Sequence, residues 1–433
     1  MKTTVEVTAG VKSKHTDGIT IEVSIPLVNS MVAGEEVIQA AVNAVGMLGT
    51  NALLEKFDTD GSAIRLGDIH LTSKGQVEKD YETPYGTIRV ERYVYQSSKG
   101  GATYCPLEDR ARIIGTATPK LAKMIASKYS RSSTDEVKDD FWENHGRDLS
   151  RGYIQQIADE VGDIALQKEG HWCYAPAIDA DKEVSTIAIG MDGAMVLMRE
   201  DGYRQAMSGS IAFYDQEGER LHTDYIATAP EYGKAKFLAR MEREITELKK
   251  RFPNACYVGI ADGASDNWKF LEKHTSIQIT DFYHATEYLT TASHAIYTNQ
   301  QEKARIAWLE KSCHHLKHQV DAVTSQLNEL KRIREQKKLS ASNQEKLDSA
   351  ITYLTNQGKR MDYSTYRSKQ LPIGSGVTEA ACKTVIKQRL CRSGMRWKDR
   401  GASIVLALKC LLQSKRWEQF WDKINQFGMP VTA

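Results

Sequence analysis

Ser185 to Gly193 reads STIAIGMDG, a short apolar run that ends in an Asp-Gly pair. Such a run, rich in β-branched residues and closed by a turn signal, predicts a buried strand. Two further stretches follow, GYRQAMSGSIAFYD (202–215) and LHTDYIATAP (221–230), with a Gln-Glu-Gly-Glu turn between them. We therefore expect a meander of successive strands in this part of the chain.

Helices and strands alternate after the meander. Residues 231–252 carry apolar side chains at helical spacing, namely Phe237, Met241, Ile245 and Leu248. ACYVGIADG (255–263) predicts a strand that ends at Asp262, and SIQITDFYH (276–284) predicts a strand that ends at Asp281. ASDNWKFLEKH (264–274) lies between them and predicts a helix. The order strand, strand, strand, helix, strand, helix, strand indicates an α/β fold.

Acidic residues follow two of the predicted strands directly. Asp192 and Asp262 each end an apolar strand and precede a glycine. Ligands and metals gather at neighbouring strand ends of α/β sheets, although an Asp-Gly pair after a strand is more often a simple turn. A third acid, Glu379, lies in LPIGSGVTEAACKTVIKQRL (371–390), between a glycine turn and a run of Lys and Arg.

These carboxylates suit metal-dependent phosphate chemistry. Carboxylate oxygens are the protein ligands that Mg²⁺ prefers. A pair of such ions activates an attacking oxygen and stabilises a leaving oxygen at a phosphodiester. The sequence therefore predicts that Asp192, Asp262 and Glu379 converge on a divalent-cation site.

The distribution of charge points to the same chemistry. The chain is nearly balanced, with 58 basic and 56 acidic residues, so the net charge predicts little about partners. Residues 383–416, however, contain ten Lys or Arg and a single acid, Asp399. Such a concentrated basic segment predicts contact with phosphates through counterion release.

Bacterial insertion-sequence transposases of the ISKra type resemble this chain in several segments: IAIGMDG (187–193), IADGASDNW (260–268), DFYHATEYL (281–289), LPIGSGVTEAACK (371–383) and KQRLCRSGMRW (387–397). The resemblance covers most of the chain from about Gly86 onward. Residues 371–397 are its most specific part, because an Asp-Gly pair alone is a weak signal.

The resemblance implies an RNase H-like mixed-sheet catalytic core with a DDE triad, carried here onto Asp192, Asp262 and Glu379. These would be both the catalytic and the metal-binding residues, with two Mg²⁺ or Mn²⁺ ions in each active site. The implied activity is cleavage of double-stranded DNA at terminal inverted repeats and strand transfer of the 3′-hydroxyl into target DNA. Because two transposon ends must be held together, a homodimer or larger assembly on DNA is expected.

Two other functions stay open. One is a structure-selective RNase H-like nuclease or resolvase, which would use the same metals on the same fold. The other is a non-catalytic, transposase-derived DNA-binding regulator, although such proteins usually lack one of the acids that stand here.

The identity of the second aspartate is also open. Asp262 is favoured because it ends the strand that directly follows the first helix after the meander, but Asp281 ends the next strand. Related transposases often carry a Cys-x-x-His pair at the position of DFYH (281–284). Here Asp281 stands in place of the cysteine, and His284 in place of the histidine. Asp281 and His284 are therefore expected beside the active site, while simple packing is the alternative for His284.

The basic segment after Glu379 supplies the DNA contacts expected of the core. Its candidate phosphate-binding residues are Lys383, Lys387, Arg389, Arg392 and Arg396. Trp397 could stack on an unpaired base. The alternative, favoured by the usual burial of tryptophan, is that its ring anchors the helix.

A helical region with a DNA-binding pattern is expected at residues 116–170. SSTDEVKDDFWENHG (132–146) opens with a capping box, in which Ser133 stands three residues before Glu136. The turn RDLS leads to a second helix, whose start carries Arg151, Tyr153 and Gln155. Two helices joined in this way suggest a helix-turn-helix that contacts DNA through these residues, or an ordinary helical hairpin. The resemblance favours the helix-turn-helix.

The remaining domain boundaries follow from changes of pattern. Residues 1–115 form a mixed N-terminal region, in which YGTIRVERYVY (85–95) predicts a strand or hairpin. The α/β core is expected in two parts, 184–289 and 361–433, which are separated by an all-helical insertion at 290–360.

The insertion is predicted to be an antiparallel helical pair. Apolar residues from Ile306 to Leu330 form one seam, and the stretch 339–343 breaks it. His314, His315 and His318 share parts of one helical surface and could bind a metal, but exposed histidines on a helix are far commoner.

Cysteine usage and the terminal segments favour an intracellular protein. The resemblance implies the bacterial cytoplasm, with association with the nucleoid when the protein is bound to DNA. The seven cysteines are scattered, odd in number and never spaced as Cys-x-x-Cys, which favours reduced thiols. Met1 to Gly10 lacks the apolar core of a signal peptide. The apolar stretch from Ser403 to Leu412 is short and interrupted by Lys409, so no membrane span is expected.

Overall fold

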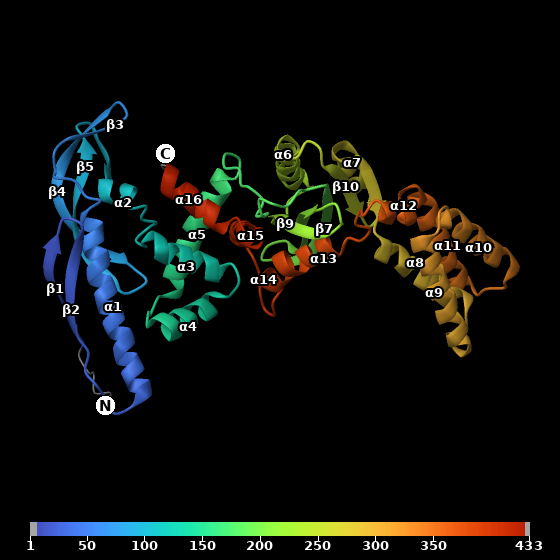
Figure 1. Cartoon of the computed structure of the whole chain (residues 1–433), viewed down its shortest axis with the longest axis horizontal. Coiled ribbons are helices and arrows are strands. Elements are labelled where there is room, and N and C mark those ends of the chain that lie inside the picture. The colour runs from blue at the N-terminus through green and yellow to red at the C-terminus, as the bar shows by residue number, and fades with distance from the viewer. Residues whose placement is uncertain (1–6, 429–433) are drawn as a thin grey trace. The chain divides into compact units, whose positions relative to one another are not determined.

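The chain folds into two compact units of mixed α/β structure in the computed structural model, which describes residues 7–428 (Figure 1). The first unit contains residues 7–174, 407–412 and 417–428, and the second contains residues 175–406 and 413–416. This division corrects the prediction that 361–433 belongs wholly to the α/β core. Residues 407–412 and the last helix belong to the N-terminal unit instead.

The N-terminal part of the first unit is built from antiparallel strands. A hairpin joins β1 (Thr8–His15) and β2 (Gly18–Ser24). A four-stranded sheet has the order β3-β4-β5-β6, with β3 at Ile64–Leu66, β4 at Ile69–Glu82, β5 at Thr87–Ser97 and β6 at Gly100–Tyr104. The short helix α2 (Pro106–Arg110) follows. Ile88, Val90 and Arg92 alternate inward along β5, as the predicted strand pattern requires.

Helix α1 (Met31–Glu55) is long and apolar enough to cross a membrane by length and composition alone, a feature that the sequence analysis overlooked. This is weak evidence, because single helices of soluble proteins pass the same test. Within its unit the helix makes specific contacts: the Asn43 amide donates to the His145 carbonyl at 2.9 Å. A Cβ at Gly46 would lie 2.3 Å from the ring of Tyr85, so the ring packs directly on the helix backbone.

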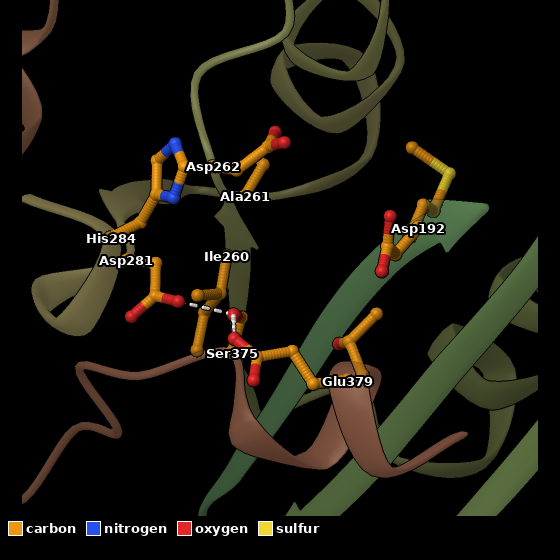
Figure 2. A pocket seen from close by; sticks show the side chains of 10 residues that line it. Asp192, Ile260, Ala261, Asp262, Asp281, His284, Ser375 and Glu379 are labelled. Atoms are coloured by element: carbon orange, nitrogen blue, oxygen red, sulfur yellow. Dashed lines mark hydrogen bonds between the residues drawn. The ribbon is translucent and has the colours of Figure 1, made fainter. Parts of the chain in front are cut away.

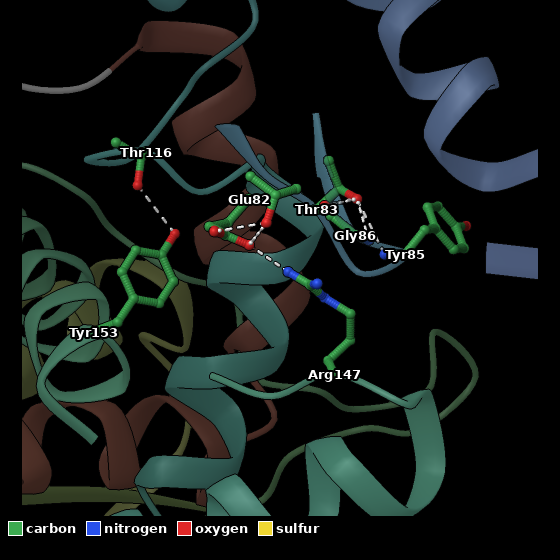
Figure 3. Close-up of polar contacts among 8 residues, drawn as sticks. Glu82, Thr83, Tyr85, Gly86, Thr116, Arg147 and Tyr153 are labelled. Atoms are coloured by element: carbon green, nitrogen blue, oxygen red, sulfur yellow. Dashed lines mark hydrogen bonds and ion pairs between the residues drawn. The ribbon is translucent and has the colours of Figure 1, made fainter. Parts of the chain in front are cut away.

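The predicted helical region contains α3 (Pro119–Tyr129), α4 (Thr134–His145) and α5 (Arg151–Lys168), which pack on one another. The capping box at Ser133 is present, and Gly146 ends α4 in the left-handed conformation at φ 61°. Figure 3 shows polar contacts that join the turn and α5 to the sheet side of this unit: Arg147 pairs with Glu82, and the Thr116 hydroxyl donates to the Tyr153 oxygen at 3.3 Å.

The second unit contains a five-stranded mixed sheet of order β11-β10-β7-β8-β9. Its strands are β7 (Thr186–Met198), β8 (Gly202–Tyr214), β9 (Arg220–Thr228), β10 (Cys256–Ala261) and β11 (Ile277–Thr280). The meander β7-β8-β9 is antiparallel, whereas β10 runs parallel to β7 and β11 parallel to β10. The predicted order of strands and helices is confirmed.

Alternate residues of β7 point to opposite faces of this sheet. Ile187 and Ile189 join a core with α6 (Ala235–Arg251) and α7 (Ser265–His274). Ala188 joins the core on the other face, which α8 (Phe282–Ile296) helps to cover. Asp192 lies four residues after Ala188, so its side chain points to the same face of the sheet, the face that α8 covers.

The helical insertion differs from the predicted pair. After α8 come α9 (Glu302–His318), α10 (Ala322–Gln336) and α11 (Ala341–Gln357). The predicted apolar seam is broken at Asp321, which takes a left-handed conformation at φ 54° before α10. An aspartate tolerates this conformation better than most residues, and the sequence pattern gave no clear sign of the break.

The segment that leads to the C-terminus is assembled from short helical pieces. A helix α12 (Tyr363–Ser368) precedes α13 (Gly376–Ala381), a π-helical turn (Cys382–Lys387) and α14 (Gln388–Leu390). Helices α15 (Asp399–Gln413) and α16 (Trp417–Phe427) follow. π-Helical turns often occur at functional sites, and this one directly follows the helix that carries Glu379.

Candidate active site

Three neighbouring parallel strands place an aspartate at the same level of the sheet. Asp262 and Asp281 directly follow β10 and β11. The prediction that Asp192 ends its strand is wrong, because β7 continues past it to Met198 in its pairing with β8. Ile260 of β10 pairs with Gly190 of β7, which brings Asp262 beside Asp192. Ala261 pairs with Thr280 of β11, and the Asp281 amide donates to the Ala261 carbonyl at 2.9 Å, which brings Asp281 beside Asp262. Strands in a sheet lie about 4.8 Å apart, so the register places a row of acids across three strands.

Asp192 and Asp262 differ in exposure. Asp192 is half-buried, and its carboxylate accepts a hydrogen bond from the Gly193 amide at 2.6 Å. Asp262 is exposed, and its carboxylate accepts from the Ala264 amide at 3.2 Å. Each carboxylate accepts one short-range backbone hydrogen bond, and Asp192 also accepts one from the Cys382 thiol. A carboxylate offers about four acceptor positions, so both have capacity for another ligand.

Asp281 is held much more tightly. Its side chain is buried, and its Oδ1 accepts from the Tyr283 amide at 2.8 Å, which caps the start of α8. Its Oδ2 accepts from the Ser375 hydroxyl. Since both oxygens are already used in the fold, Asp281 is better suited to supporting the site than to changing partners within it.

Glu379 is positioned by its neighbour Thr378, which packs on the sheet. The Thr378 hydroxyl lies 2.7 Å from the Ser210 hydroxyl of β8, and a Cβ added to Gly190 would lie 2.0 Å from Thr378 Oγ1. Glycine at 190 therefore lets α13 pack directly on β7. This contact places the exposed side chain of Glu379 at the same pocket as Asp192.

Ser375 connects two of the acids and was missed by the sequence analysis. Its hydroxyl donates to Asp281 and lies 3.2 Å from Glu379 Oε1 (Figure 2). Its position between Gly374 and Gly376, just before a helix, is the only sequence signal that could have indicated it.

These residues surround one polar pocket of about 150 Å³. Its lining includes all four acids, His284, Ser375 and Thr378. A site for one water needs roughly 10–15 Å³ by this kind of measure, so the pocket has room for ions with their water ligands. Figure 2 shows Asp281 and Glu379 turned toward Ser375, with Asp192 and Asp262 apart from that pair.

The donor set fits a hard divalent cation, because carboxylate oxygens dominate the polar lining. Within residues 7–428, however, no three His, Cys, Asp or Glu side chains lie close enough together to hold a metal ion as they are placed. A cation shared by Asp192, Asp262 and Glu379 would therefore require rotation of these side chains. Asp262 and Glu379 are exposed, which leaves them the freedom to rotate.

Cys382 is a buried neighbour of Asp192 and was not singled out from the sequence. Burial raises the pKa of its thiol, and the neighbouring negative charge of Asp192 raises it further. The thiol therefore stays protonated and acts as a neutral neighbour of Asp192.

His284 lines the pocket, in agreement with its predicted place beside the site. Its Nδ1 lies 3.2 Å from Glu287, and its ring packs edge-on against Tyr288 and Tyr353. The predicted metal alternative for His314, His315 and His318 gains no support, because these residues belong to no group of three potential ligands in the described chain.

The basic segment divides into exposed and structural residues. Lys383, Lys387, Arg392 and Arg396 are exposed, as phosphate contacts require. Arg389 is not: its side chain is only 2% exposed, and its guanidinium lies over the Trp397 ring at 4.9 Å. The prediction that Arg389 binds phosphate is therefore wrong, because the residue is part of the packing.

Trp397 anchors the segment to the sheet. Its indole nitrogen donates to the Leu390 carbonyl at 2.9 Å, its amide donates to the Leu197 carbonyl, and its carbonyl accepts from the Arg199 amide. The residue thus extends the edge of β7, and Arg389 covers one face of its ring. These contacts favour the anchoring alternative over stacking on a base.

The residues predicted to begin a recognition helix make contacts within their own unit. Arg151 is exposed and pairs with Asp135. Gln155 uses both ends of its amide within the unit, accepting from the Tyr129 hydroxyl at 2.8 Å and donating to Asp159 at 2.7 Å. Tyr153 is half-buried against Thr116. Of these, Arg151 is the residue best placed to reach a ligand.

Comparison with known proteins adds no assignment: no protein-family model matches the chain, and no curated protein is significantly similar to it.

Proposed function

We propose that the chain is a DDE transposase with an RNase H-like catalytic core. The observation that carries this proposal is the register that sets Asp192 beside Asp262, where the parallel pairing of β7 with β10 ends, with Glu379 at the same pocket. The strand order β9-β8-β7-β10-β11, with an antiparallel meander and two parallel strands, agrees with such a core. The resemblance to insertion-sequence transposases, which covers most of the chain from about Gly86 onward and is most specific at residues 371–397, supports the same function.

Each part of the site has a role in this chemistry. Asp192, Asp262 and Glu379 would hold the divalent cations, Mg²⁺ or Mn²⁺, which activate the attacking oxygen and stabilise the leaving oxygen of a phosphodiester. Lys383 and Lys387 follow Glu379 on the same helical segment and would bind the flanking phosphates. Ser375, whose hydroxyl contacts both Asp281 and Glu379, would hold Glu379 beside the pocket.

Double-stranded DNA is the proposed partner, as transposon ends and as target. The helical region at 116–170, with Arg151 exposed at the start of α5, would bind the terminal repeats. Exposed Arg392 and Arg396 would extend the DNA contacts of the core. A homodimer or larger assembly would hold two ends together, in the bacterial cytoplasm where the DNA lies.

A strand-transfer assay tests the activity. A donor carrying the element's ends and a target plasmid are incubated with the protein and Mg²⁺, and joined products are scored. Asp192→Ala and Glu379→Ala should each reduce cleavage roughly a hundredfold or more, because groups that stabilise transition-state charge typically contribute this much. DNA binding should persist, since the exposed cations remain.

Asp266→Ala is the matched control, because Asp266 is an exposed acid that pairs with Lys269 on the surface of α7. Cleavage without joined products would favour the nuclease or resolvase. DNA binding without any cleavage by the wild-type protein would favour the regulator.

Conservative substitutions identify the second aspartate. Asp262→Asn should abolish cleavage, whereas Asp281→Asn should keep a substantial part of it. The asparagine at 281 can still accept from the Tyr283 amide and contact Ser375. The opposite result, an active Asp262→Asn and an inactive Asp281→Asn, would make Asp281 the metal ligand.

A further inference from the structure

Helix α11 of the insertion contacts the loop that carries Asp262. The Tyr353 hydroxyl donates to the Asp262 carbonyl at 2.7 Å, and the Gln357 amide donates to the Gly263 carbonyl at 3.2 Å. Two successive carbonyls beyond the end of β10 are therefore bound by side chains that lie about ninety residues later in the chain.

This loop needs such partners because it leaves the sheet at Ala261. Beyond that residue the parallel ladder with β7 and β11 has ended, so the carbonyls of Asp262 and Gly263 have no strand partner. Gly263 takes φ +124°, which residues with a Cβ rarely adopt. A Cβ there would also lie 3.2 Å from the Tyr353 ring, so the loop and α11 are in close contact.

Both donors are fixed in place by their own neighbours. The Tyr353 ring stacks on Tyr288 at 3.8 Å with an interplanar angle of 7°. Burial and the nearby negative charges raise the pKa of Tyr353, so its hydroxyl keeps the proton that it donates. Gln357 accepts from the indole nitrogen of Trp268 at 3.1 Å, which leaves its amide nitrogen directed at Gly263.

We propose that Tyr353 and Gln357 are positioning residues for Asp262, so that the helical insertion sets the geometry of the second acid. Asp262 itself is exposed and has one weak contact through its carboxylate. Its position therefore depends on the backbone of the loop, which α11 holds. Supporting groups of this kind typically tune a metal site by orienting its ligands. The catalytic meaning of this clamp rests on the proposed function.

Hydrogen exchange of the full-length protein tests the clamp without any assay of activity. Tyr353→Phe keeps the ring that stacks on Tyr288 and removes only the hydroxyl. We expect exchange in a peptide covering 261–268 to accelerate roughly three- to tenfold, as the loss of one hydrogen bond allows. Gln357→Ala should also accelerate exchange in this peptide. Asn356→Ala, at an exposed neighbouring position on α11, should leave the exchange rate unchanged. Unchanged exchange in both variants would overturn the proposal.

The Mg²⁺ dependence of cleavage tests the functional role. Tyr353→Phe should raise the half-saturating Mg²⁺ concentration roughly three- to tenfold while cleavage at saturating Mg²⁺ stays near the wild-type rate. A purely structural role would lower the amount of folded protein and leave the Mg²⁺ dependence unchanged. Wild-type dependence in the variants, with an active wild-type protein, would overturn the positioning role and leave the proposed function intact. Lack of cleavage by the wild-type protein would overturn both.

Discussion

Gly190 shows how one missing side chain sets the position of Glu379, a proposed metal ligand. Its Cα faces Thr378 so closely that a Cβ would lie 2.0 Å from the hydroxyl oxygen and 3.2 Å from Thr378 Cβ. Thr378 itself is buried and bonded to Ser210, so it has little room to move. Any displacement of Thr378 is passed to Glu379, the next residue of α13.

Gly190→Ala should therefore impair the site more than the fold. Overpacking of this kind costs about 1–3 kcal/mol of folding free energy, and we expect cleavage to fall tenfold or more because Glu379 is displaced. Urea unfolding and the cleavage assay would measure the two effects. The double variant Gly190→Ala/Thr378→Ala removes the clashing hydroxyl and should recover part of the activity. A fully active Gly190→Ala would show that α13 does not depend on this contact.

The site predictions failed at residues whose burial or contacts depend on distant parts of the chain. Arg389 belongs to the same basic run as Lys383 and Lys387, and its sequence context gives no sign that it is buried. The π-helical turn changes the spacing of side chains along this segment, so an ordinary helical pattern misplaces them. Ser375, Tyr353 and Gln357 were missed because each acts through contacts with residues distant in sequence.

At the scale of elements, the strand order was predictable because each strand has its own local signal. Apolar runs followed by Asp-Gly or Asp located β7, β10 and β11, and the alternation in residues 85–95 located β5. The Asp-Gly pair did not mark the end of β7, which continues to Met198. Register was not predictable, since pairing Gly190 with Ile260 depends on contacts across the sheet. The break at Asp321 was missed for a related reason: the apolar spacing continues across it, and only the backbone conformation shows where α9 ends.

Glu108, a charged residue of α2, links this helix to the four-stranded sheet of the first unit. One oxygen of Glu108 accepts from Lys79 at 2.7 Å and from the Tyr81 hydroxyl at 2.6 Å, and it lies 3.3 Å from Arg92. Burial by itself would raise the pKa of Glu108, but these hydrogen bonds and positive charges outweigh it and lower the pKa below its ordinary value. Folding therefore favours the ionised carboxylate.

This balance predicts a pH-dependent contribution to stability. A carboxyl group with a lowered pKa in the folded state stabilises the fold fully above its unfolded pKa, near 4.5, and loses this contribution as the pH falls through the folded value. Glu108→Gln should lower the free energy of unfolding by about 1–3 kcal/mol at neutral pH. The difference from wild type should shrink steadily on acidification below the unfolded pKa. Urea titrations across this range measure it, with exposed Glu78→Gln as the control. A difference that is independent of pH would contradict this account.

At the scale of the whole molecule, the first unit is built from both ends of the chain. Helix α16 buries Trp417, Phe420, Trp421 and Ile424. Phe420 is fully buried and packs edge-on against Trp172, with ring centroids 5.9 Å apart. Lys123 of α3 pairs with Glu418, and Arg112 donates to the Asn425 carbonyl. The sequence pattern predicted 361–433 as one C-terminal part of the core, whereas tertiary packing assigns the last helix to residues far away in sequence.

Phe420→Ala should therefore destabilise the unit that contains the N-terminal half of the chain. Replacing a fully buried phenylalanine typically costs about 3–5 kcal/mol, so local hydrogen exchange should accelerate strongly in α3 and α5. Exchange in β7 and β10 should stay close to wild type, because these strands belong to the other unit. Gln426→Ala, an exposed change on the same helix, serves as the control. Equal acceleration in both units would mean that the chain unfolds as a single cooperative block, and acceleration confined to β7 and β10 would contradict the placement of α16.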